Sequence, residues 1–216
     1  MMTQKMKAAL STMVAATVLV VSVQADASVS FNDKELAKLQ AGKTVKQPLA
    51  RSRTNGFYGG TGWAIIDAPV DVVWAAIEDF NSYAKYYPRT NDVKEISRKG
   101  DRSLVRMELG YKMLSISYHV DVVRDAAKKM IRYRLVTNRP HDIEDTRGYW
   151  RLFPQKDGRT LVAYAISVQV PMGIINLIGP TMEEKIERHL LGVPGNLKEW
   201  VEGPTGSVYR QITARK

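Results

Sequence analysis

The spacing of hydrophobic residues changes along the chain, from a helical period to strict alternation and back to a helical period. Between Val93 and Val170 apolar side chains occupy every second position, which predicts antiparallel strands with one buried and one solvated face. The alternating sets include Val105, Met107, Leu109, Tyr111; Ile116, Tyr118, Val120, Val122; Ile131, Tyr133, Leu135; Gly148, Trp150, Leu152; and Val162, Tyr164, Ile166, Val168, Val170. Turn-forming residues separate these runs, so we expect a meander of strands.

A strand and two short helices are predicted before this run. The glycine-rich segment from Gly56 to Asp67 ends in Trp63-Ala64-Ile65-Ile66, which indicates a strand. Pro69 suits the first turn of a helix whose apolar face holds Val70, Val73, Trp74 and Ile77. Residues 81–87 predict a second short helix, ended by Pro88.

The helical period returns after the last strand. One helical phase is kept by Leu177, Ile178, Met182, Ile186, Leu190, Val193, Leu197 and Val201, and it continues across Pro194-Gly195. This predicts one long amphipathic helix that is kinked at the proline. Because an antiparallel sheet with one apolar face must be covered, we expect this helix to cover it. Residues 204–216 are predicted to be a flexible basic tail.

The N-terminus has the three parts of a secretory signal peptide. Lys5 and Lys7 precede a mostly apolar stretch over residues 8–23, and the small residues Ala25-Asp26-Ala27 follow. We therefore predict a signal peptide over residues 1–27, cleaved after Ala27, and a periplasmic or secreted protein. An uncleaved membrane anchor is the alternative. Residues 28–55 predict a short helix followed by a basic, extended connector.

Composition excludes several functions. The chain of 216 residues has no cysteine, so disulfides, cysteine nucleophiles and thiolate metal sites are excluded. The net charge of +10 comes from basic residues mixed with acidic ones, which favours an ordinary solvated surface. Transient contact with an anionic membrane surface is the next interpretation, and we expect no nucleic-acid partner. We expect a monomer.

Catalytic motifs are missing from the sequence. It contains no Gly-x-Ser-x-Gly elbow, no His-Glu-x-x-His pair and no phosphate-cradling loop. His141 lies beside Asp142, Glu144 and Asp145, but without the ligand spacing of a metal site, so a solvated acidic turn is the better interpretation. We predict no catalytic residue, no metal and no cofactor.

Two groups of residues carry a resemblance to a known superfamily. They are Asp67-Ala68-Pro69-Val70-Asp71-Val72-Val73-Trp74 with Ile77, Asp79-Phe80, Tyr83 and Tyr87-Pro88, and Gly148-Tyr149-Trp150-Arg151-Leu152-Phe153-Pro154 with Asp157-Gly158-Arg159-Thr160 and Tyr164. Over residues 56–203 the chain resembles the START-like (SRPBCC) superfamily, especially its polyketide cyclase/dehydrase and coenzyme Q-binding branch. The resemblance implies an α+β helix-grip fold, in which a curved antiparallel sheet wraps around a long C-terminal helix.

The resemblance also implies a cavity between the sheet and that helix. Together with the export signal and the missing catalytic groups, this predicts an exported carrier of a hydrophobic molecule. A lipid, isoprenoid, sterol or polycyclic molecule would suit it. The candidate ligand-binding residues are Met107, Tyr118, Tyr133, Trp150, Tyr164, Met182, Ile186 and Leu190, with Met172, Ile174 and Ile175 at the cavity mouth. Plain core packing is the competing interpretation of the ligand-binding residues, and a buried helix start is that of the mouth residues.

Two other functions stay open. One is a cyclase or aromatase-like enzyme that positions its substrate with Tyr118, Tyr133 and Arg106. The other is a module that binds membrane surfaces through the basic exterior and the apolar loop over residues 170–178.

Overall fold

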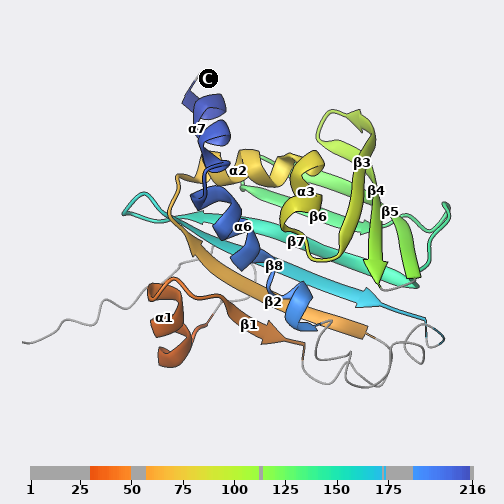
Figure 1. The fold of residues 1–216 in the computed structure, drawn as a ribbon, viewed down its shortest axis with the longest axis horizontal. Coiled ribbons are helices and arrows are strands. Elements are labelled where there is room, and N and C mark those ends of the chain that lie inside the picture. The colour runs from red at the N-terminus through yellow and green to blue at the C-terminus, as the bar shows by residue number, and fades with distance from the viewer. Residues whose placement is uncertain (1–29, 50–56, 112–113, 172, 174–186, 215–216) are drawn as a thin grey trace, which may run out of the picture. The chain divides into compact units, whose positions relative to one another are not determined.

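Eight antiparallel strands form one sheet in the order β1-β2-β8-β7-β6-β5-β4-β3 (Figure 1). The computed structural model describes residues 30–49, 57–111, 114–171, 173 and 187–214. The strands are β1 (Val45–Pro48), β2 (Phe57–Ile66), β3 (Thr90–Lys99), β4 (Arg102–Tyr111), β5 (Leu114–Asp125), β6 (Met130–Leu135), β7 (Asp145–Pro154) and β8 (Thr160–Gln169). All belong to one unit, which begins at Asp33.

Helices cover one face of the sheet. Helix α2 (Val70–Glu78), the 3-10 turn η2 (Phe80–Ser82) and helix α3 (Tyr83–Tyr86) lie in front of it with α6 (Val193–Glu202) in Figure 1. Helix α1 (Asp33–Gln40) packs beside β1 and β2. The predicted helix-grip fold is confirmed by this arrangement of a curved sheet and a C-terminal helix. Among the described residues, no helix is both long enough and apolar enough to cross a membrane.

The predicted alternation sets the inward face of the sheet. Met107 lies opposite Tyr118 across β4 and β5, and Trp150 lies opposite Tyr164 across β7 and β8. These inward side chains are buried, while Arg106 and Arg132 on the other side of their strands are not. The core therefore lies between the sheet and the helices.

Glycines allow the close contacts of β2. Gly59 and Gly60 have φ angles of 144° and 142°, a region that residues with a Cβ rarely adopt. A Cβ on Gly59 would also overlap the carbonyl oxygen of Ile166 on β8. The irregularly spaced glycines of this strand thus permit a bent backbone and the close approach of the neighbouring strand.

Three predicted segments differ from the structure. The segment predicted as a basic connector contains a strand, β1. This strand pairs with β2, with Val45 opposite Trp63, and adds one strand at the edge of the sheet. It could not be distinguished from a loop because it has only four residues and ends in Pro48. The end of the chain is helix α7 (Gly206–Ala214) rather than a flexible tail, because its Tyr209 is buried against the rest of the molecule.

The predicted long helix is interrupted before the proline. Residues 187–190 are helical, Leu191 and Gly192 form a turn, and α6 starts at Val193. Pro194 occupies the first turn of α6. Backbone N–H groups in the first turn have no acceptor within the helix, so the missing N–H of proline costs no helical hydrogen bond. The kink predicted at Pro194-Gly195 was wrong, because the proline begins a helix instead of bending one. Residues 174–186 of the predicted helix lie outside the described part of the chain.

Candidate functional site

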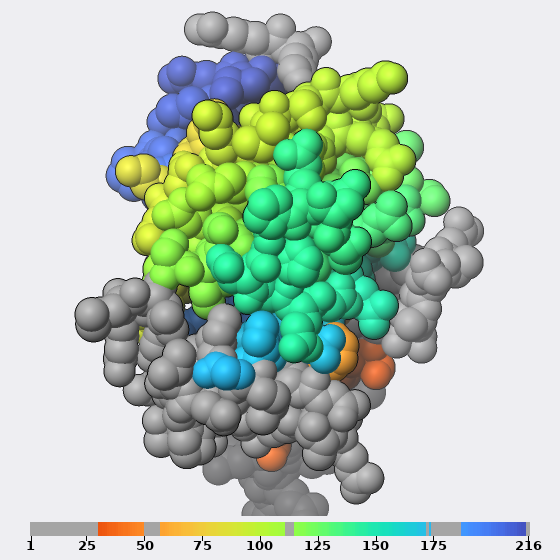
Figure 2. Space-filling view, turned by 90° about the vertical axis from the view of Figure 1, so that its right-hand side faces the viewer, coloured from red at the N-terminus to blue at the C-terminus, as the bar shows by residue number. Residues whose placement is uncertain are grey.

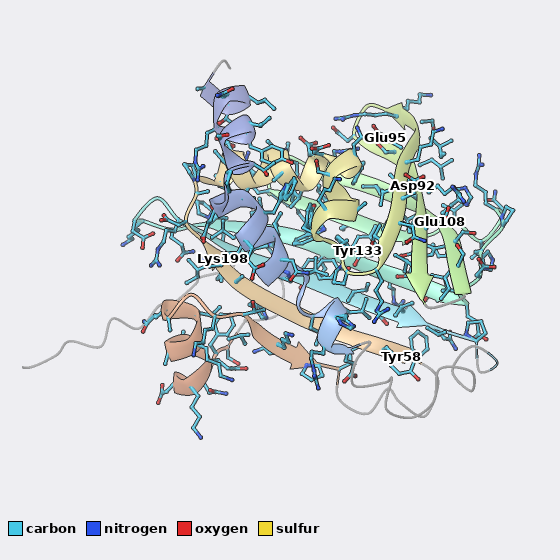
Figure 3. The ribbon with its side chains drawn as sticks, in the orientation of Figure 1. Tyr58, Asp92, Glu95, Glu108, Tyr133 and Lys198 are labelled. Atoms are coloured by element: carbon cyan, nitrogen blue, oxygen red, sulfur yellow. The ribbon has the colours of Figure 1, made fainter. Side chains whose placement is uncertain are left out.

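A small cavity of about 40 Å³ lies between the sheet and the short helices. Five predicted ligand-binding residues line it, one from each of the strands β4 to β8: Met107, Tyr118, Tyr133, Trp150 and Tyr164. Figure 3 shows Tyr133 in the space between the sheet and α3. The other lining residues are Phe80, Tyr83, Tyr87, Val105, Val120, Val122, Ile131 and Ile166.

Tyr164 lies at the centre of an aromatic cluster. Its ring centroid lies 4.5 Å from that of Trp150, 5.7 Å from that of Tyr87 and 6.3 Å from that of Tyr133. The Tyr87 ring meets it edge-on, and the Tyr133 ring is stacked on it. Aromatic pairs of this kind stabilise the folded state by more than their buried area alone would. These rings therefore form a well-packed wall of the cavity.

The hydroxyls of the cluster stay protonated. Burial raises the pKa of Tyr164 to about 12, although the neighbouring Tyr133 and Tyr87 oppose the rise in pKa. Burial likewise raises the pKa values of Tyr87, Tyr118 and Tyr133. At neutral pH these hydroxyls are therefore neutral. Tyr133 already donates its proton to the carbonyl oxygen of Ala165, so a ligand oxygen would meet one of the other hydroxyls.

A second, larger pocket of about 140 Å³ lies at one end of the sheet. It shares Tyr118 and Ile166 with the first cavity, so these two side chains form the partition between them. Its other lining residues are Pro88, Arg89, Leu109, Gly110, Ile116, Ile143, Thr146, Val168, Val170, His189 and Leu190. Figure 2 views this end, where the segment between β6 and β7 lies across the centre. Leu190, a predicted ligand-binding residue, is thus in the second pocket and not in the first.

The remaining predicted residues fall elsewhere. Met182, Ile186, Met172, Ile174 and Ile175 lie outside the described residues. Arg106, considered for a cyclase, pairs instead with Glu108, at 2.8 Å, and with Asp92, at 3.9 Å, on the outer side of the sheet. It is therefore not available to a molecule in either pocket.

The comparisons with known proteins agree with this geometry. Residues 61–202 match the family described as polyketide cyclase / dehydrase and lipid transport. The chain belongs to this family. The match begins within β2 and ends with α6, so it includes every element that lines the two pockets.

Several solved structures of this family's fold are similar to the chain at low sequence identity. The aromatase/cyclase Zhui from a Streptomyces species has a TM-score of 0.52 and 19% identity, covering 67% of this chain and 96% of its own. A START superfamily protein from Mycobacterium smegmatis has a TM-score of 0.54 and 17% identity, covering 67% and 97%. A STAR-related lipid transfer protein from Xanthomonas axonopodis has a TM-score of 0.53 and 13% identity, covering 73% and 98%. No curated protein matches the sequence.

These likenesses establish the fold and leave the activity open. Enzymes and lipid-transfer proteins are both among the similar structures, and the family description names both. Function must therefore be argued from the pockets of this chain. Within the part of the chain that the structure describes, no group of His, Asp and Glu residues is arranged to hold a metal ion.

Sequence reasoning missed the contribution of the short helices to the first cavity. Phe80, Tyr83 and Tyr87 line it and complete the aromatic wall opposite the sheet. A signal for them was present, since Tyr83 and Tyr87 are four residues apart and share one face of the helix predicted over residues 81–87. Their rings are stacked 5.1 Å apart.

Proposed function

We propose that this protein binds an apolar small molecule in the space between its sheet and its helices. The observation that carries the proposal is the pair of adjoining pockets, which share only Tyr118 and Ile166 among their described lining residues. Their walls are mainly hydrocarbon and aromatic, with a few hydroxyls and, in the second pocket, Arg89 and His189. Such a lining is usual for a small-molecule site.

The volumes limit what fits. An apolar cavity of about 150 Å³ accepts one benzene ring. The second pocket, at about 140 Å³, therefore holds one ring or a short hydrocarbon segment. A larger ligand has to displace Tyr118 or Ile166 and so join the two pockets. The first cavity, at about 40 Å³, then receives the deep end of the ligand beside Tyr164.

The chemistry of the first cavity supports binding rather than turnover. Among the described residues of the first cavity, only tyrosines carry an ionisable group, and burial raises their pKa values. A general acid or base works best with a pKa near the operating pH. These tyrosines are better suited to orient a ligand oxygen than to move a proton.

Titration with 1-octanol, followed by amide NMR, tests the proposal. We expect shifts at residues around both pockets, and a Val168→Trp variant should abolish them by filling the second pocket. Ile212→Trp is the matched control, because Ile212 lies on the surface, 45% exposed. Shifts scattered over the surface, or binding that survives Val168→Trp, would contradict the proposal. Extraction and mass spectrometry of the natively purified protein would identify the natural ligand.

We also propose that the protein is exported. Support comes from the charged, apolar and small-residue segments of residues 1–27. N-terminal sequencing of the protein recovered outside the cytoplasm should begin at Ser28. Recovery of the intact N-terminus from the same fraction would contradict cleavage after Ala27.

A further inference from the structure

A polar pocket adjoins the apolar pocket at the end of the sheet. It has a volume of about 280 Å³ and shares Pro88 and His189 with its apolar neighbour. Its remaining lining residues are Thr44, Lys46, Arg188, Gly192, Gly195, Asn196 and Glu199. A molecule that crosses Pro88 and His189 therefore passes from a hydrocarbon surface to a charged one.

Two cations define this polar pocket. Lys46 on β1 donates a hydrogen bond from Nζ to the carbonyl oxygen of Arg188, at 2.9 Å, so the two residues are in contact. Among the residues that the structure describes, neither forms an ion pair with a carboxylate. Glu199 is the acidic residue of the lining. Lys46 and Arg188 are also accessible to solvent, so a ligand can reach them.

The positive charge of Arg188 disfavours the charged form of Lys46. Partial burial lowers the pKa of Lys46, and the positive charge of Arg188 lowers it further. An anion placed between them would relieve this repulsion and would accept charge-assisted hydrogen bonds from both side chains. The pocket is therefore better matched to an anion than to a neutral or cationic group.

We infer that the ligand is an amphipathic anion, with its apolar part in the 140 Å³ pocket and its carboxylate or phosphate at Lys46 and Arg188. The inference rests on the proposed function and names the class of molecule. Thr44 and Lys46 precede the segment that matches the family, residues 61–202. One of the two cations, Lys46, thus comes from outside the matched segment, and the other, Arg188, comes from within it.

Four probes that share one alkyl chain test this inference: octanoate, octyl phosphate, 1-octanol and octyltrimethylammonium. Calorimetric titration of the full mature chain should show octanoate or octyl phosphate binding about tenfold tighter than 1-octanol, as one or two charge-assisted hydrogen bonds contribute. The preferred anion of the two distinguishes a carboxylate from a phosphate head group. Raising the salt concentration should reduce the preference.

Variants separate the head group from the tail. Lys46→Gln and Arg188→Gln should each remove most of the preference for the anion and leave 1-octanol binding unchanged, which also shows that the variants are folded. Lys43→Gln, an exposed lysine outside the pocket lining, is the control and should keep the preference.

The outcomes are distinguishable. Equal affinity for octanoate, octyl phosphate and 1-octanol, or tighter binding of octyltrimethylammonium, would overturn this inference and leave the proposed function standing. A preference that persists in both variants would also overturn it. If none of the four probes binds, the proposed function fails, and this inference fails with it.

Discussion

The hydroxyl of Tyr133 on β6 donates a hydrogen bond to the carbonyl oxygen of Ala165 on β8, 3.0 Å away. Strand β7 lies between these two strands, so the Tyr133 side chain must cross it. It does so at Gly148, the residue directly opposite Tyr133 in the strand pairing. The ring thus lies flat over a glycine and forms one wall of the aromatic cluster.

Replacement of this glycine should be costly. In Gly148→Ala, the new Cβ would overlap both the Tyr133 hydroxyl and the Ala165 carbonyl oxygen. We expect a loss of about 2–3 kcal/mol in the free energy of unfolding, as for overpacked cores, measured by urea denaturation. Tyr133→Phe removes only the hydrogen bond and should cost about 1 kcal/mol. If Gly148→Ala lowers the free energy of unfolding by less than Tyr133→Phe does, the ring does not lie across this position.

Arg124 should be the most important charged residue for stability. Its side chain is 2% exposed and reaches Glu78 at 3.0 Å and Glu95 at 3.2 Å, which joins α2 to β3 and β5. It also donates to the Ser103 hydroxyl at 2.7 Å and lies 5.1 Å from the Phe80 ring centroid. Glu95 is labelled on β3 in Figure 3.

Arg124→Met should therefore cost about 2–3 kcal/mol of unfolding free energy. Breaking a buried pair costs about 3–5 kcal/mol, but here the two carboxylates keep some contact with water after the arginine is gone. Arg102→Met is the matched control, since Arg102 is 60% exposed and pairs with Asp121 at 2.7 Å on the surface. It should cost less than about 1 kcal/mol. Equal losses in the two variants, by chemical denaturation, would argue against a structural role for the buried cluster.

The inward face of the sheet could be predicted from alternation alone. Tyr118, Tyr133, Trp150 and Tyr164 line the first cavity because a strand places every second residue on the same side. Cavity volume could not be predicted this way, because it depends on how Tyr118 and Ile166 fill the middle of the fold. Lys46 could not be placed near Arg188 either, since the two residues meet only through the edge pairing of β1 with β2.

The C-terminal helices show a different limit of sequence reasoning. Val193, Leu197 and Val201 keep the phase of the preceding residues, and all three are fully buried as that phase predicts. This helical spacing of apolar residues does not indicate whether the backbone turns at Leu191 and Gly192. That turn packs so closely on Gly62 of β2 that a Cβ there would overlap the Leu191 carbonyl oxygen. The interruption is thus decided by tertiary contact.

Stability should fall steeply in alkali. The ordinary tyrosine pKa is 10.0, and burial raises the pKa of Tyr164 to about 12 and those of Tyr87, Tyr118 and Tyr133 in the same direction. Between pH 10 and 12 the unfolded chain loses phenolic protons that the folded protein keeps, so unfolding is increasingly favoured as the pH rises. Below pH 10 both states keep these protons, so the free energy of unfolding does not depend on them.

Tyr164 alone should contribute a loss of about 2–3 kcal/mol across this window, from about 1.4 kcal/mol per pKa unit. Denaturant titrations at several pH values, with phenolate absorbance as a second signal, would measure it. Tyr164→Phe should reduce the dependence on pH by the share of this one hydroxyl, while Tyr87, Tyr118 and Tyr133 keep theirs. If the free energy of unfolding stays constant between pH 10 and 12, these hydroxyls are not buried in the folded protein.

Helix α7 should be required for full stability, in contrast to a flexible tail. The Tyr209 hydroxyl donates to the Asp79 carboxylate at 3.0 Å and accepts a hydrogen bond from the Trp200 indole at 3.2 Å, which fixes α7 to α6 and to the end of α2. Tyr209→Phe removes both hydrogen bonds and should lower the unfolding free energy by about 1–2 kcal/mol. Arg210→Ala, next to it on the exposed side of α7, should change stability by less than about 0.5 kcal/mol. Thermal denaturation followed by tryptophan fluorescence would report both. An unchanged midpoint in Tyr209→Phe would mean that α7 does not stabilise the fold through this contact.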